Sequence, residues 1–140
     1  VQEQIRIAAG EKLRYRQEDV VFRGHAIECR VNAEDPVNFM PSPGGVESFH
    51  MPGGPGVRVD THLYDGYKVP PNYDSMIAKV IAYGDSRETA IARMRVALDE
   101  MVVKGIKTNI PLQQRLMSDP GFVAGGNNIH YLEQLLAKSE

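Results

Sequence analysis

The chain has 140 residues, of which 42% are hydrophobic and 24% are charged, and its formal net charge is −2. This length and composition predict one domain with a core of its own. The nearly balanced charge provides no basic field for nucleic acid or an anionic membrane, and we expect neither partner. No apolar run approaches the ~20 residues of a membrane span, so the cytoplasm is the expected compartment. The single cysteine, Cys29, excludes an internal disulfide and is expected to pack in the core.

The first half of the chain is dominated by β-strand signals. A short helix is predicted over residues 2–9, with Gly10 in the position of a C-cap glycine. Four runs then have strand composition and are bounded by proline- and glycine-rich turns. These runs cover residues 20–32, 45–50, 57–64 and 76–83.

Beyond residue 83 the apolar residues recur with the period of a helix. The predicted stripe comprises Ala90, Ile91, Met94, Ala97, Leu98 and Met101. Asp85 or Ser86 is the expected N-cap of this helix, and Gly105 is its expected end. A shorter helix is predicted to start near Pro111 and to run to about Met117.

A last helix is predicted after the glycine-rich loop at residues 125–128. Its expected apolar face comprises Ile129, Leu132, Leu135 and Leu136. On the preceding long helix, Arg95 and Asp99 are spaced four apart and are expected to form a solvated pair. Strands followed by helices predict an α+β fold of antiparallel strands followed by helices.

Arg30 is the main candidate for a functional side chain. With period two, His25, Ile27, Cys29 and Val31 share one face of a strand, and Ala26, Glu28, Arg30 and Asn32 share the other. Arg30 therefore points away from the apolar side as a permanent cation, which suits a carboxylate, bicarbonate, phosphate or developing enolate. Glu28, roughly 6.6 Å along the same face, is expected to orient it. The alternative is a surface ion pair, which contributes about 0 to 1 kcal/mol.

Other candidate sites have weaker support in the sequence. The loop at residues 53–56 lacks the lysine and Ser/Thr of a phosphate-binding loop and is predicted to be a turn. The four histidines show no metal-binding spacing, and we expect no metal ligand among them. Asp74 is expected to cap a turn or to reach across a domain interface. The acidic pair before Pro36 is expected to form a loop.

Six motifs, in order and with consistent spacing, resemble the C-terminal domain of biotin carboxylase. They are GHAIECRVNAEDP (24–36), FMPSPG (39–44), PGGPGVR (52–58), GYKVPPNYDSMI (66–77), AIARM (90–94) and GIKTN (105–109). The resemblance extends from about Gln2 to Leu136. One departure is Pro55, where some members carry an aromatic residue.

The resemblance implies an ATP-grasp enzyme, in which ATP and bicarbonate give carboxyphosphate and its breakdown carboxylates biotin. Arg30 matches the arginine that approaches bicarbonate and biotin. Residues 1–18 would be a connecting helix and linker from the preceding ATP-grasp region, and residues 19–137 the C-terminal domain. ATP and Mg²⁺ would be bound by that preceding part, so this chain alone is expected to be inactive.

The resemblance also implies partners. Family members form homodimers through this domain, and Pro55, Arg58 and Asp74 match that surface. The other expected partners are the rest of the carboxylase chain, the biotin carboxyl carrier protein and a carboxyltransferase. The similarity is greatest to the free-standing subunit of bacterial acetyl-CoA carboxylase, which serves fatty acid biosynthesis.

Three alternatives remain open. In the first, the domain is mainly a dimerisation module and Arg30 is dispensable. In the second, the domain belongs to another biotin-dependent carboxylase. In the third, it belongs to another ATP-grasp ligase.

Overall fold

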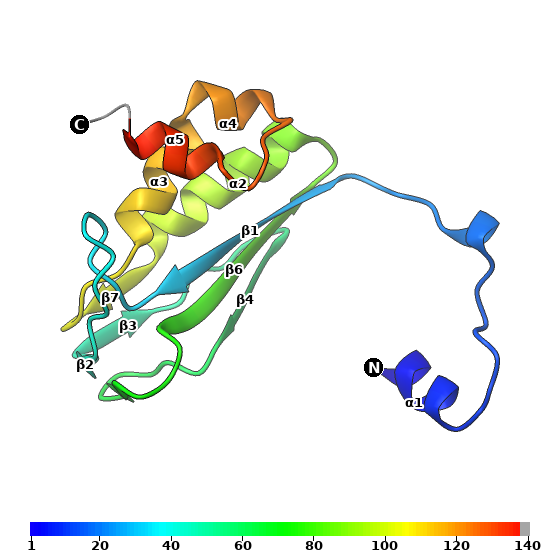
Figure 1. Cartoon of the computed structure of the whole chain (residues 1–140), viewed down its shortest axis with the longest axis horizontal. Helices are drawn as coiled ribbons and strands as arrows, with labels where there is room; N and C mark the ends of the chain where they lie inside the picture. The colour runs from blue at the N-terminus through cyan, green and yellow to red at the C-terminus, as the bar shows by residue number, and fades with distance from the viewer. Residues whose placement is uncertain (138–140) are drawn as a thin grey trace.

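Antiparallel strand pairs and a cluster of helices make up the folded part of residues 1–137, the part of the chain that this computed structural model describes (Figure 1). The helices are α1 (Gln2–Ala8), the 3-10 turn η1 (Gln17–Asp19), α2 (Arg87–Glu100), α3 (Ile110–Ser118), α4 (Pro120–Ala124) and α5 (Tyr131–Ala137). The strands are β1 (His25–Asn32), β2 (Gly44–Gly45), β3 (Ser48–His50), β4 (Val57–Thr61), β5 (Lys68–Val69), β6 (Met76–Gly84) and β7 (Val102–Lys104). The mixed α/β character and the antiparallel pairing agree with the predicted fold.

The main sheet has three antiparallel strands in the order β1–β6–β4, and its two faces differ in burial. On β1, Ile27, Cys29 and Val31 are buried, whereas Glu28 and Arg30 are exposed, as the alternation predicts. Smaller pairs form between β2 and β5 and between β3 and β7. The sheet therefore has an inner face in the core and an outer face toward solvent.

Helix α2 covers the inner face of the sheet. Its buried residues are Ala90, Ile91, Met94, Ala97 and Leu98, which confirms most of the predicted stripe. Ser86 is the N-cap, and its side chain accepts a hydrogen bond from the Thr89 amide over 3.2 Å. The predicted end at Gly105 is wrong. The helix ends at Glu100, because the chain then extends into β7 and pairs with β3.

Three of the predicted strands are wrong in extent, and in two of them the reason is that a strand needs a pairing partner. Residues 20–24 lie outside β1, and Phe22 is 95% exposed there, since no strand within residues 1–137 pairs with this segment. The run at 45–50 divides into β2 and β3. Val46 donates to Tyr67 and Glu47 donates to Lys104, so the chain changes partners between β5 and β7.

The run predicted over 57–64 also ends early, at Thr61, whereas the run at 76–83 is confirmed as β6. The short strands β5 and β7 and the helix α4 were not predicted. Helix α3 is confirmed, with Pro111 in its first turn.

Two predictions about the helices, one on α5 and one on α2, need correction. Ile129 lies outside α5 and is 89% exposed, because the helix begins only at Tyr131. Arg95 and Asp99 do not pair with each other. Arg95 donates to the carbonyl of Met117 over 2.7 and 3.0 Å, and Asp99 accepts from Gln114 over 2.9 Å. Both side chains thus join α2 to α3.

Residues 1–24 form an arm that extends away from the sheet and the helices (Figure 1). Helix α1 is confirmed, and Gly10 follows it with φ of +86°. No residue of the arm is buried.

Candidate functional site

The outer face of the main sheet gathers charged side chains from all three strands. Across the strands, the register aligns Arg30 with Lys79 and Lys79 with Asp60. Side chains that are directly opposite in an antiparallel pair have Cβ atoms about 5 Å apart. Two cations, Arg30 and Lys79, are therefore neighbours at one corner of this face. Like charges placed this way repel each other, and whereas Lys79 has the Asp60 carboxylate on its other side, Arg30 has no such counter-charge in the strand register of residues 1–137, so an anion is favoured beside Arg30.

The Arg30 guanidinium has little to hold it. Within residues 1–137, its one hydrogen bond runs from Nε to the thioether sulfur of Met76 over 3.3 Å. A sulfur is a weak acceptor, so the five donors of the guanidinium are nearly all available. A pocket of about 260 Å³ is lined by Met76 and Lys79 together with Asp60, Thr61 and His62, so it lies between β6 and the end of β4, and Arg30 is not among its lining residues.

Arg58 and Asp60 form the best-defined ion pair on this face. Arg58 Nε and Nη2 donate to the two oxygens of Asp60 over 2.9 and 2.8 Å. This pairing lowers the pKa of Asp60, and the charge of Lys79 lowers it further. The pKa of Arg58 is raised in turn by Asp60. Arg58 is thus neutralised within the chain, whereas Arg30 is not.

The other predicted site residues make no hydrogen bond to the Arg30 side chain. Glu28 is exposed, and the structure gives it no bond to Arg30, so its orienting role stays a prediction. Pro55 is exposed in the loop before β4. Asp74 Oδ1 accepts the backbone N–H of Met76 over 2.7 Å, which confirms that it caps a turn.

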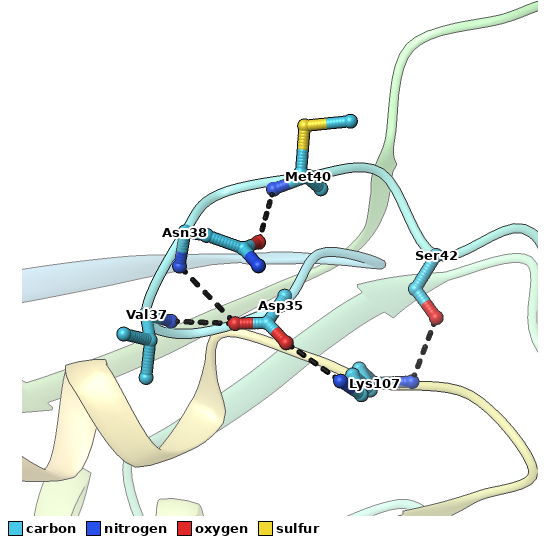
Figure 2. Close-up of polar contacts among 6 residues, drawn as sticks. All are labelled: Asp35, Val37, Asn38, Met40, Ser42 and Lys107. Carbon is cyan, nitrogen blue, oxygen red and sulfur yellow. Dashed lines mark hydrogen bonds and ion pairs between the residues drawn. The ribbon is translucent and has the colours of Figure 1, made fainter.

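Side-chain hydrogen bonds hold the loop after β1, and the residues that make them were not predicted (Figure 2). Asp35 Oδ1 accepts the N–H groups of Val37 and Asn38 over 2.9 and 3.1 Å, and its Oδ2 accepts from Lys107 Nζ over 2.7 Å. The Lys107 ammonium is the main reason that the pKa of Asp35 falls to about 2. The backbone N–H of Lys107 also donates to Ser42 over 3.0 Å. A loop was expected here, but Lys107, which bonds to Asp35, lies 72 residues further along the chain.

Cys29 is a core residue, as predicted. It is 2% exposed, and burial followed by the charge of Glu28 raises the pKa of its thiol to about 12. Among residues 1–137, no group of three or more His, Cys, Asp or Glu side chains is arranged to hold a metal ion. None of the helices in this range is long and apolar enough to cross a membrane.

A family model described as the biotin carboxylase C-terminal domain matches residues 28–134. The chain belongs to this family. The biotin carboxylase of Pseudomonas aeruginosa is 66% identical to this domain over 136 residues, which make up 97% of the chain and 30% of the relative. The chain thus spans about 30% of the length of the curated relatives that it matches.

Solved structures of biotin carboxylases have the same fold. The biotin carboxylase subunit of a pyruvate carboxylase is 48% identical, with a TM-score of 0.90, and the match covers 98% of this chain and 31% of that one. The biotin carboxylase domain dimer of Hydrogenobacter thermophilus 2-oxoglutarate carboxylase is 50% identical, with a TM-score of 0.88, over 94% of this chain and 29% of that one. That structure is a complex with MgADP, ADP and bicarbonate.

Proposed function

We propose that this domain completes the active site of an ATP-dependent biotin carboxylase of ATP-grasp class, and that Arg30 is the residue that meets the reacting anions. One observation carries the proposal. Arg30 and Lys79 are opposite each other on the outer face of the sheet, and within residues 1–137 the Arg30 guanidinium is bonded to no carboxylate. The bicarbonate in the similar 2-oxoglutarate carboxylase structure supports an anion of this kind.

The chemistry of biotin carboxylation suits a fixed cation. Bicarbonate, carboxyphosphate and the ureido enolate of biotin are all anions, and an arginine stays charged throughout the reaction. A donor placed where charge develops lowers the barrier, and removing one costs about 3 to 4 kcal/mol in other enzymes. Arg30 would supply such a donor. In this assignment ATP and Mg²⁺ are bound by the part of the full-length enzyme that precedes the domain, so the 140-residue chain alone is inactive.

The same proposal includes an assembly. Residues 1–18 connect to the preceding region and residues 19–137 form the C-terminal domain, although the extended arm continues to Gly24 in the structure. The full-length enzyme is a homodimer, which the dimer of the 2-oxoglutarate carboxylase domain supports. Its dimer surface is assigned to Pro55, Arg58 and Asp74. Biotin arrives on a carboxyl carrier protein, and a separate carboxyltransferase uses the carboxybiotin.

The acceptor of the carboxyl group is proposed to be acetyl-CoA, in the first step of fatty acid biosynthesis in the cytoplasm. Pyruvate and 2-oxoglutarate have support as alternative acceptors, because two of the similar structures come from carboxylases of these compounds. Assaying the full-length enzyme with each matching carboxyltransferase distinguishes these acceptors.

The test of Arg30 is an Arg30→Ala variant of the full-length enzyme, assayed for biotin carboxylation and bicarbonate-dependent ATP hydrolysis. We expect carboxylation to fall by about 100-fold or more, the usual effect of losing one charge-stabilising donor. Lys104→Ala is the control, because it removes an exposed cation from β7 in a different sheet. Near-normal carboxylation by a folded Arg30→Ala enzyme would favour the dimerisation module over a catalytic role.

A further inference from the structure

The backbone of Arg30 lies on the open edge of the main sheet. Strand β1 is an edge strand, and β6 pairs with only one of its sides. In an antiparallel strand, the N–H and C=O of one residue point toward the same edge of the strand, and those of every second residue point the same way. The Asn32 N–H and C=O both bond to Asn109, so Asn32 faces away from β6. Arg30, two residues earlier, faces the same way.

The side chain of Asn109, joined by that of Gln113, closes this edge at the Arg30 carbonyl. Asn109 Oδ1 accepts the Asn32 N–H over 2.9 Å, and Asn109 Nδ2 donates to the Arg30 carbonyl over 3.1 Å. The backbone N–H of Asn109 donates to the Asn32 carbonyl over 3.1 Å. Gln113 Nε2 gives the Arg30 carbonyl a second donor over 3.3 Å. The amide of Asn109 therefore takes the place that the peptide group of another strand would occupy.

Asn109 makes these bonds instead of the bond usual at its position. It is the N-cap of α3, where an asparagine side chain ordinarily accepts from the first turn of the helix. Here the side chain makes no such capping bond. The residue is 7% exposed, so its amide sits in the interior and points at β1.

We propose that Asn109, assisted by Gln113, is a positioning residue for Arg30. Among residues 1–137, the guanidinium is held only by the thioether of Met76, so the direction of the side chain follows from the backbone of β1. Lys107, two residues before Asn109, donates to Asp35 (Figure 2). Residues 107–109 thus hold the chain at Arg30, at Asn32 and at Asp35. The inference rests on the proposed function, because fixing Arg30 matters only if Arg30 meets the reacting anions.

The test uses Asn109→Ser in the full-length enzyme. Serine is as good an N-cap as asparagine, but it is too short to bridge Arg30 and Asn32. We expect kcat/KM for bicarbonate to fall by about 10- to 100-fold, the effect of a small misplacement of a catalytic group. The matched control is Gln114→Ala, because Gln114 lies on the same helix but bonds to α2, at Leu98 and Asp99. Its kcat/KM should stay at the wild-type value.

A double-mutant cycle separates positioning from general destabilisation. Asn109→Ser should have no further effect on the residual activity of Arg30→Ala, because the group that it positions is gone. An equal loss in both backgrounds, or an unchanged kcat/KM in Asn109→Ser alone, would overturn the inference. If Arg30→Ala is inactive and Asn109→Ser is normal, the proposed function stands and only the positioning fails. Near-normal activity of Arg30→Ala would overturn both.

Gln113→Met covers the case in which Asn109→Ser does not fold. It removes one of the two donors to the Arg30 carbonyl and keeps the length of the side chain. We expect a loss of about fivefold in kcat/KM, the equivalent of one neutral hydrogen bond, and again no effect in the Arg30→Ala background. An unchanged kcat/KM in this variant would overturn the inference.

Discussion

Replacing Leu98 by alanine tests the packing that supports the outer face of the sheet. Leu98 is fully buried on α2, which covers the inner face of the strands that carry Arg30 and Lys79. Alanine has high helix propensity, so the substitution leaves the helix itself intact and removes only core contacts.

The expected loss follows from the atoms removed. Leucine to alanine deletes three buried carbon groups at about 0.8 kcal/mol each, which gives roughly 2.4 kcal/mol before any cavity is counted. The cavity adds about 24 cal/mol for each Å³ that the neighbours do not refill, so a total of about 3 to 4 kcal/mol is expected. At about 4 °C per kcal/mol, Tm should fall by roughly 12 to 16 °C.

The assay is thermal and urea unfolding of the chain, followed by circular dichroism. The control is Val96→Ala, two residues away on the same helix, where the side chain is 64% exposed. Its unfolding free energy should stay within about 0.5 kcal/mol of the parent. Similar Tm shifts in the two variants would refute the reasoning, because they would mean that α2 is not packed through Leu98.

Two further predictions concern charged pairs. Because the native pKa of Asp35 is about 2 against an ordinary 3.8, the stability that it contributes is present above pH 3.8 and is lost as the pH falls toward 2. Lys107→Met removes the main cause of that shift, so this variant should lose less unfolding free energy between pH 7 and pH 3 than the parent protein does. Unfolding at both pH values measures the loss, and an equal loss in the two proteins would contradict the prediction. Arg58→Glu should weaken self-association of the full-length enzyme in sedimentation at low concentration. The double variant Arg58→Asp, Asp60→Arg exchanges the two charges and keeps the intrachain pair, and it should weaken self-association too. An unchanged dimer in both proteins would remove Arg58 from the interface.

Local residue patterns predicted the elements in which the pattern is long and continuous. The alternation from His25 to Asn32 identified the buried face of β1, and the period of the α2 stripe identified its core residues. Ser86 and Pro111 marked helix starts correctly, because capping and the fixed φ of proline act within one turn. The predictions failed where pairing decides the outcome. The segment at residues 20–24 has strand composition but pairs with no strand in the described part of the chain, and the 45–50 run changes its pairing partner in its middle.

The sequence by itself determined the family, the fold class and Arg30 as the candidate residue, because these depend on motifs and on periods that neighbouring residues set. Only the tertiary structure decided what surrounds Arg30. The register that brings Lys79 opposite to it is set by the whole β1–β6 pairing. Asn109 closes the strand edge from 79 residues away. Such contacts depend on how the chain returns to itself, which no local pattern of residue types records.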